Sequence, residues 1–452
     1  RKLNQLVANF LQNGLRRNLI SSHPIIDAIA PLALLGLLAK SLLPKYQQGL
    51  LADMAKWQSP EVKTRLAFTS TDQPTIPSTN HPKLGFTDNE QVARVAELLR
   101  NIGLTYGFSE LVVLMGHGSM SQNNPHLAAY DCGACSGRHG GPNARVFAAM
   151  ANRPEIRKQL AECGINIPVD TWFIGAEHNT CNEAISWLDL NDIPKDRLAS
   201  FKKLLLELRH AQLMSAHERC RRLASAPRKP TPKEALAHVE ERASDFSQAR
   251  PELGHATNAS AVVGRRSITQ GAFFDRRVFL ISYDPTQDAD GKILEGVLLA
   301  VAPVGAGINL EYYFSTINNE RLGCGSKVTH NITGLFGVME GGGSDLRTGL
   351  PQQMIEIHEA MRLQLVVEAK TSVLERIYSE QESLRELIAG GWLHLSTKDP
   401  DSGEIFVFER GTGFILWQTN TKIPPLRDNS SDCYRDKTLP VPPMLIKQPT
   451  LM

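Results

Sequence analysis

The chain has 452 residues, of which 42% are hydrophobic and 21% charged, an ordinary composition for a globular protein with room for one large or several smaller domains. A formal net charge of +2 and an aromatic content of 6%, with no basic run interleaved with aromatic residues, argue against a nucleic-acid-binding protein. Seven cysteines at irregular spacings favour a reducing compartment over a disulfide framework, and we expect Cys163 and Cys220 to be small buried residues.

The first 45 residues have the pattern of helices. The chain starts at Arg1 and no signal-peptide pattern follows, so we expect the sequence to begin inside a longer protein. The longest apolar stretch, residues 25–43, contains Asp27, Pro31 and Lys40 and falls short of the about 20 mostly apolar residues that span a bilayer. It predicts a buried or surface-lying helix, with contact to a membrane or a partner as the alternative.

A long loop and the first α/β elements follow. Residues 48–88 are polar and rich in Pro, Thr and Ser, which predicts a loop. The apolar spacing of residues 89–101 predicts a helix, whose start Thr87 or Asp88 can cap. The short apolar run 111–115, bounded by glycine, predicts a buried strand that ends in a functional loop.

Beyond a loop rich in Gly and Asn, the pattern indicates one more helix and strand and then long helices. Residues 143–151 predict a helix, and residues 171–180 predict a second strand that ends in a polar loop. Residues 196–226 predict a long basic helix, which the prolines at 227–232 separate from a helix at 233–247.

The last part of the chain mixes strands, helices and glycine-dense loops. Short β-like runs, the last of which can also be helical, lie at 260–264, 276–284 and 295–304. Residues 353–388 predict a long helical hairpin, and the segment after it predicts a β-hairpin that turns at residues 399–403. The Pro-rich tail after Thr419 is expected to be extended.

One block concentrates residues that carry chemistry. Residues 116–146, GHGSMSQNNPHLAAYDCGACSGRHGGPNARV, hold three His, two Cys and one Asp among glycines. Thiolates and imidazoles are the ligands that zinc prefers, and α/β proteins place their sites on loops that leave strand ends. The block therefore predicts a metal site.

Two sets of ligands compete within this block. The local set is Cys132, Cys135 and His139, with His126 as a further candidate, and its spacing fits a structural zinc site slightly better. The dispersed set is His117 after the strand and Cys132 after the loop, with further ligands elsewhere. In a third interpretation the cysteines hold no metal and the glycines only allow a tight loop. A redox Cys-x-x-Cys pair is disfavoured, because this pair lies in a glycine loop rather than at a helix start.

The block closely resembles the DabA family, the large subunit of a two-part system that accumulates dissolved inorganic carbon. The likeness runs from about residue 103 to 408, and long blocks in the expected order are more specific than any single motif. These further blocks are GINIPVDTWFIGAEHNT, RPELGHATNASAVVGRR, EYYFSTINNERLGCGSKVTHNITGLFGVMEGGGSDLRTGLP and GWLHLSTKDPDSGEIFVF.

The resemblance implies a metal site similar to that of β-carbonic anhydrases. It implies an α/β fold with an incomplete β-carbonic-anhydrase-like core and an additional helical, loop-rich C-terminal region. It assigns Zn²⁺ to His117 and Cys132 and leaves Asp131, Cys135 and His139 as supporting or packing residues. The family's other two ligands and its catalytic Asp-Arg pair belong to a Cys-x-Asp-x-Arg motif, and no cysteine of this sequence is followed two residues later by Asp. We therefore expect them in a missing N-terminal half, and this fragment to be inactive alone.

The resemblance also implies a function and a partner. Zinc-dependent hydration of CO2 to bicarbonate would be coupled to a DabB-type proton-conducting membrane subunit, with the protein held peripherally on the cytoplasmic side of the inner membrane. The alternative is a non-catalytic scaffold that docks the membrane subunit and holds a structural zinc at Cys132, Cys135 and His139.

Two further groups carry structural and functional alternatives. His178 follows the second predicted strand as His117 follows the first, and it either lines the same site or only bonds loop carbonyls. Residues 323–331, GCGSKVTHN, offer Lys327 and backbone amides to an anion such as bicarbonate, whereas their mismatch to the phosphate-loop pattern argues against nucleotide binding.

The expected organisation has five segments. They are an N-terminal helical segment and loop at 1–88, an α/β zinc-site region at 89–195, long helices at 196–250, a mixed α/β region at 251–420 and a Pro-rich tail at 421–452.

Overall fold

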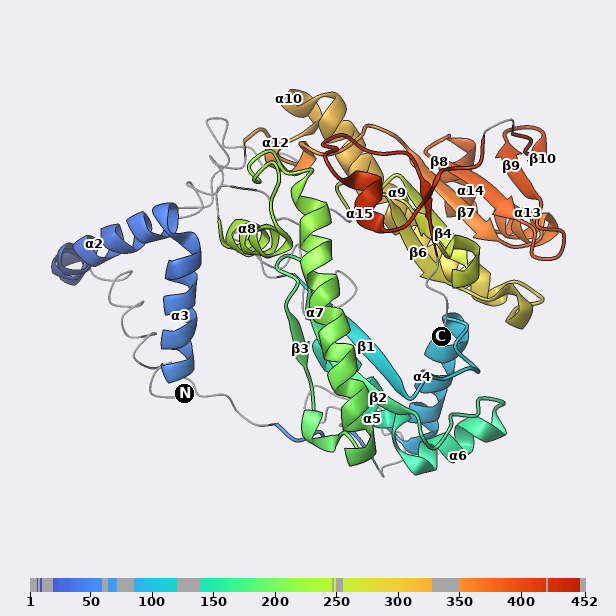
Figure 1. The fold of residues 1–452 in the computed structure, drawn as a ribbon, viewed down its shortest axis with the longest axis horizontal. Helices are drawn as coiled ribbons and strands as arrows, with labels where there is room; N and C mark the ends of the chain where they lie inside the picture. Colours follow the sequence, from blue (N-terminus) through green and yellow to red (C-terminus); the bar gives the residue numbers. More distant parts are fainter. Residues whose placement is uncertain are drawn as a thin grey trace.

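The computed structural model describes residues 6, 9, 19–58, 64–70, 85–119, 139–245, 248, 255–326, 349–419 and 422–447. Within this part of the chain the protein is mixed α/β, with three separate sheets and helices packed on them (Figure 1). The predicted α/β class is therefore confirmed at this level.

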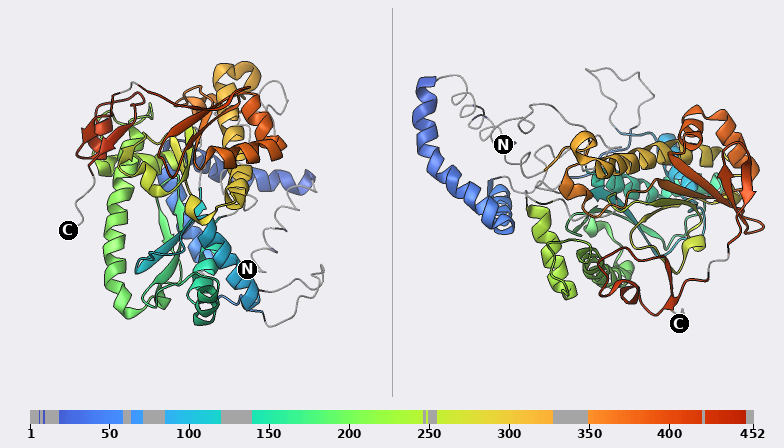
Figure 2. Two further views of the ribbon diagram at one scale, coloured as in Figure 1. Left: turned by 90° about the vertical axis from the view of Figure 1, so that its right-hand side faces the viewer. Right: turned by 90° about the horizontal axis from the view of Figure 1, so that it is seen from above.

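Two N-terminal helices, α2 (Leu19–Leu42) and α3 (Pro44–Gln58), stand away from the sheets (Figures 1 and 2). The helical prediction for the first 45 residues is confirmed from residue 19 onwards, and residues 10–18 lie outside the described part of the chain; the predicted loop from residue 48 is wrong as far as residue 58. Residues 48–58 are rich in Gln, Leu, Ala, Met and Lys, which are strong helix formers, and the Pro-rich composition begins only after them.

A three-stranded sheet has the order β1-β2-β3, with β1 and β2 parallel and β3 antiparallel to β2. The predicted helix at 89–101 and both predicted strands are confirmed. Thr87 caps α4 in a capping box with Glu90. The elements are α4 (Asp88–Asn101), β1 (Leu111–Gly118), α5 (Gly141–Ala151), α6 (Pro154–Glu162), β2 (Trp172–Asn179), β3 (Ile185–Trp187) and α7 (Leu198–Cys220).

Helices cover both faces of this sheet. On one face, Val95 of α4, Phe147 of α5 and Ile156 of α6 share a core with Phe173 of β2. On the other face, Ile174 packs with Phe201 of α7 and with Trp187. Alternate residues of β2 thus enter two different cores, and this is why the strand reads as a nearly continuous apolar run.

A six-stranded sheet has the order β10-β9-β8-β7-β4-β6, and its strands β6, β4, β7 and β8 are parallel. The predicted β-hairpin at 399–403 is confirmed as the antiparallel β8–β9 pair. The strands are β4 (Ser260–Gly264), β6 (Val278–Ser282), β7 (Leu363–Glu368), β8 (Leu393–Lys398), β9 (Ile405–Glu409) and β10 (Gly413–Leu416).

Residues 295–304 belong to the helix α9 (Lys292–Ile317), so of their two predicted conformations the helical one is confirmed. The predicted helical hairpin at 353–388 is corrected, because it contains the strand β7 before its two helices α13 (Thr371–Glu380) and α14 (Glu382–Ala389). Strand β7 has only six residues, and periodicity alone does not distinguish a short apolar run of this length from a helical segment.

Helix α9 is long and apolar enough to cross a membrane by length and composition alone. One of its faces lies in the core of the six-stranded sheet, where Leu294, Leu298 and Ala302 contact Leu363 and Leu365 within one buried cluster. Its apolar character is therefore explained on this face by packing on the sheet.

The remaining elements are short or connect the two sheets. The tail is more ordered than predicted, because β11 (Leu426–Arg427) and β12 (Met444–Ile446) form a small sheet with β5 (Ala272–Phe273) around α15 (Ser430–Tyr434). The other helices are α8 (Pro232–Ser244), α10 (Asn319–Leu322) and α12 (Gln352–Ile355). Short 3-10 turns lie at Leu190–Asp192, Lys195–Arg197, Arg266–Thr269 and Pro285–Gln287.

The expectation for the two cysteines is half right. Cys220, at the end of α7, is buried as expected. Cys163 is exposed, because it caps the C-terminus of α6 just before Gly164, whose φ of 85° turns the chain at the surface.

Candidate functional site

The carboxyl ends of β1 and β2 bring two histidines side by side. The two strands pair in parallel, and the register sets His117 directly opposite His178. Paired residues on neighbouring parallel strands point to the same face, and this is the face that α7 covers, because Ile174 of the same series packs against Phe201. His178 therefore lies beside His117, and its ring bonds the carboxylate of Glu183 rather than a loop carbonyl, while a shared metal site stays a prediction.

His117 lies inside the last part of β1, not after it as the sequence suggested. Its carbonyl oxygen accepts a hydrogen bond from Gly140 N at 2.7 Å. The ring itself is half-buried and makes no hydrogen bond or ion pair within the described residues. An imidazole so placed can serve as a ligand without breaking another interaction.

On the opposite face, Glu177 binds the start of α5. Its carboxylate accepts a hydrogen bond from Gly141 N at 3.1 Å and lies 3.1 Å from His139 Nδ1. A carboxylate is favourable at a helix N-terminus, where backbone N–H groups lack partners. The close packing needs glycine, since a Cβ on Gly116 would lie 2.5 Å from the carbonyl carbon of Gly140.

A buried network of charged residues contacts the ring of His178. Glu183, in the turn between β2 and β3, lies 2.7 Å from His178 Nε2, accepts a hydrogen bond from Ser215 at 2.5 Å and pairs with Arg219 at 2.8 Å. Only 5% of Glu183 and 1% of Arg219 is exposed. Burial alone would raise the pKa of Glu183, but His178, Arg219 and Ser215 outweigh it and lower the pKa to about 2.

The ionised Glu183 fixes the orientation of the His178 ring. A carboxylate can only accept, so the proton on this side is held by His178 Nε2. Glu183 has a φ of 63°, a backbone conformation that non-glycine residues rarely adopt. Strain of this kind persists only where surrounding contacts hold it and is common at functional sites. A cavity of about 400 Å³ opens beside Glu183 between α3, α7 and α8.

A thiol and a hydroxyl also meet at the strand ends. The Ser119 Oγ lies 3.2 Å from Cys181 Sγ, and both residues are buried. Sequence reasoning missed Cys181, Glu183 and Arg219. The first two follow the strand at 171–180 in a polar loop and carried a weak local signal, whereas Arg219 reaches the site from α7 and carried none.

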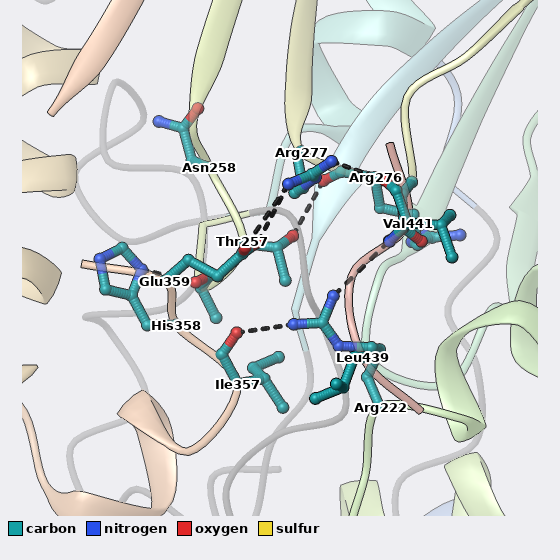
Figure 3. A network of polar contacts seen from close by, with 12 residues as sticks. Arg222, Thr257, Asn258, Arg276, Arg277, Ile357, His358, Glu359, Leu439 and Val441 are labelled. Atoms are coloured by element: carbon teal, nitrogen blue, oxygen red, sulfur yellow. Dashed lines mark hydrogen bonds and ion pairs between the residues drawn. The ribbon is translucent and has the colours of Figure 1, made fainter. Parts of the chain in front are cut away.

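A second polar network joins four distant segments beside this site (Figure 3). Arg222 donates to Ile357 O at 3.0 Å, and Arg277 pairs with Glu359 at 3.3 Å and donates to Val441 O at 2.6 Å. These contacts join the end of α7, the segment before β6, residues 357–359 and the C-terminal segment. We assign it a structural role.

The two networks are linked through one hydroxyl. Arg276 donates to Ser215 Oγ at 3.1 Å, and Ser215 donates to Glu183. The orientation of Glu183 therefore depends on the region that carries the six-stranded sheet.

Several predicted residues lie outside the described part of the chain. These are residues 120–138, with His126, Asp131, Cys132 and Cys135, and residues 327–348, with Lys327. The pairing of His117 with Cys132 and the local set with His139 both stay predictions. Among the described residues there is no group of three or more His, Cys, Asp or Glu that could hold a metal ion.

Comparison with known proteins identifies a family. The family model described as "Probable inorganic carbon transporter subunit DabA" matches residues 1–393. A protein of that description from Methylococcus capsulatus is 58% identical over 442 residues, which are 98% of this chain and 41% of the relative. One from Nitrosococcus oceani is 52% identical over 459 residues, with 98% and 41% covered, and one from Dechloromonas aromatica 53% over 437 residues, with 96% and 43%. The chain thus spans less than half of the length of these relatives, and no solved structure matches it.

Proposed function

The chain belongs to the DabA family of probable inorganic carbon transporter subunits, and on this premise we propose that it supplies part of a zinc site for CO2 hydration in an energy-coupled uptake complex. The substrates are CO2 and bicarbonate. The observation that carries the proposal is the His117 ring, which lies at the carboxyl end of a parallel strand and makes no hydrogen bond or ion pair within the part of the chain that the structure describes. In open α/β sheets, ligands bind at this end of the strands.

His117 and Cys132 are the proposed zinc ligands of this chain. Imidazole and thiolate together suit Zn²⁺, but two ligands do not close a tetrahedral site. The remaining two are proposed to come from the part of the longer relatives that this chain does not span. When bound, zinc lowers the pKa of its water to about 7 and so provides hydroxide for attack on CO2.

The described residues would hold and orient this site. Glu183 and Arg219 fix the His178 ring next to His117, and Glu177 with the glycines at 140 and 141 fixes the start of α5 against β1. We also propose that the core resembles that of β-carbonic anhydrases. The parallel β1–β2 pair, with helices on both faces of its sheet, supports this.

We further propose that the protein lies peripherally on the cytoplasmic side of the inner membrane and works with a DabB-type proton-conducting membrane subunit. The relatives are named subunits of a transporter, which implies a partner. A proton gradient across that subunit would supply the energy for one-way hydration.

The test is the zinc content of the protein that spans the full length of its relatives. His117→Ala and Cys132→Ala are each expected to lower bound zinc strongly, because removing one of four ligands opens the site. Cys163→Ala, which removes an exposed cysteine elsewhere, is the matched control and is expected to keep the metal. Unchanged zinc in both ligand variants would refute the assignment.

The alternative is a scaffold that docks the membrane subunit around a structural zinc at Cys132, Cys135 and His139. The contact between His139 Nδ1 and Glu177 favours it, because metal-bound histidines usually bond a carboxylate through the second nitrogen. Zinc loss in Cys135→Ala and His139→Ala, with zinc retained in His117→Ala, would select this alternative.

A further inference from the structure

Helix α2 exposes large apolar side chains along most of its length. The exposed fractions are 69% for Leu32, 57% for Leu34, 62% for Leu35, 47% for Leu38 and 74% for Leu42. The helix stands apart from the sheets in Figure 1 and in the view from above in Figure 2. Apolar surface of this extent, continuous over one element, marks a membrane or interaction site.

The exposure surrounds the helix. Every residue from 30 to 36 is exposed, and successive residues of a helix point about 100° apart. Leu34 and Leu35 therefore face different directions while both are exposed. A helix that binds a groove in a protein shows one apolar stripe and a polar back, whereas residues 28–39 of α2 include no polar side chain. A helical stretch that is apolar and exposed on all sides suits an apolar medium that surrounds the helix.

The positions of charge and the length of α2 identify that medium. Between Arg17 and Lys40 the sequence has one charged residue, Asp27. The helix has 24 residues, about 36 Å, but it bends by 48° between Ser22–Ala28 and Ala30–Leu42. Pro31 lies just after the break and removes a helical hydrogen bond there. The straight apolar part is about 20 Å long, too short for a hydrocarbon layer about 30 Å thick.

From these observations we propose that α2 inserts into one leaflet of a lipid bilayer and anchors the protein to it. Lys40, near the end of the apolar part, then lies at the level of the headgroups, where a long basic side chain keeps its charge in water. This proposal names α2 as the part of the protein that holds it at the membrane proposed above. It does not depend on whether the protein hydrates CO2.

Helix α3 attaches this anchor to the body of the protein. Lys45 pairs with Glu240 of α8 at 2.8 Å, and Gln48 accepts a hydrogen bond from Ser244 of the same helix. The buried cores of both large sheets contain no residue of α2. Substitutions on the exposed face of α2 are therefore expected to leave the fold unchanged.

The test is flotation of the 452-residue chain with vesicles of phosphatidylcholine. The unaltered chain is expected to float with the vesicles, also at high salt, because insertion of apolar side chains is not screened. The triple variant Leu32→Asn, Leu35→Asn, Leu38→Asn is expected to lower the partition coefficient at least about a hundredfold. The matched control Leu206→Asn, Ile423→Asn, Leu439→Asn alters three exposed apolar residues outside α2 and is expected to float like the parent chain.

Three outcomes overturn the proposal. The first is a parent chain that stays with the soluble fraction, or a triple variant that floats as well as the parent. The second is a dimer without vesicle binding that the triple variant abolishes, which would assign α2 to a second copy of the chain. The third is binding only to vesicles that contain a membrane protein partner. The triple variant in the full-length protein is expected to keep its zinc, so failure here and failure of the zinc site are distinguishable.

Discussion

The three-stranded and six-stranded sheets have similar architectures, but they differ in the side chains at the carboxyl ends of their parallel strands. Both have parallel strands covered by helices. In the three-stranded sheet, the carboxyl ends carry His117, Glu177 and His178, and one imidazole has no partner among the described residues. In the six-stranded sheet, the end of β7 carries Glu368, fully buried and bonded by Arg265 N at 2.8 Å. Topology alone therefore does not distinguish the two strand ends, whereas an imidazole without a partner among the described residues does.

The two buried carboxylates sharpen this contrast. Glu368 is paired with one arginine, whose side chain is 36% exposed. Glu183 is paired with an arginine that is 1% exposed, and also with a histidine that faces the candidate site. A buried carboxylate–arginine pair thus only satisfies a strand end in the six-stranded sheet, whereas in the three-stranded sheet the carboxylate also orients the ring of His178.

The largest effect is expected from Arg219→Ala. It leaves Glu183 buried with less compensation, which should lower the free energy of unfolding by about 4 kcal/mol. Arg265→Ala should cost less, because the backbone N–H of residue 265 still bonds Glu368. Urea unfolding of both variants measures the difference. Equal losses would remove the distinction between the two carboxylates.

The next effect tests the core of the six-stranded sheet. Leu365 is 2% exposed and packs between α9 and α13 within the largest cluster, so Leu365→Ala should cost about 3 kcal/mol through lost burial and the cavity left behind. The zinc content of the full-length variant should not change. Loss of zinc without unfolding would show that the sheets are not independent.

A third prediction concerns pH. The pKa of Glu183 is lowered from 4.5 to about 2, so its contribution to stability is complete above pH 4.5 and is lost as the pH falls towards 2. Glu183→Gln should therefore reduce the slope of unfolding free energy against pH within this window. An unchanged slope in acid titrations followed by circular dichroism would contradict the ionised network.

The smallest effect is at the start of α4. Thr87→Ala removes the side chain that accepts from Glu90 N and should cost about 1 kcal/mol. Thr231→Ala removes the same cap from α8, which belongs to neither sheet, and is the matched control. Thermal unfolding compares them, and a loss well above that of Thr231→Ala would mean that Thr87 does more than cap the helix.

Local patterns predicted much of this fold. The capped helix α4, the strands β1 and β2 and the β8–β9 hairpin were found because their signals lie within a few residues. Strand β7 was missed because it has only six residues and lies next to helical segments, and periodicity alone does not identify so short an apolar run as a strand. The division into five segments stays a prediction.

The site was only partly predictable. The sequence singled out His117, and its resemblance to the family named Cys132 as the partner, but contacts such as that of Glu183 with Arg219 span 36 positions and depend on the packing of α7. The alignment of His117 with His178 likewise depends on a parallel register that no local pattern specifies.

Because of the β1–β2 register, the number of residues in β1 before position 117 decides whether His117 and His178 lie on the same face of the sheet. Side chains alternate between faces along a strand, so one residue inserted in β1 before position 117 would turn the imidazole towards α5 and away from His178. Two inserted residues would return it. Natural variation in this strand should therefore preserve an even spacing, and odd insertions should separate the two rings even where every individual residue type is kept.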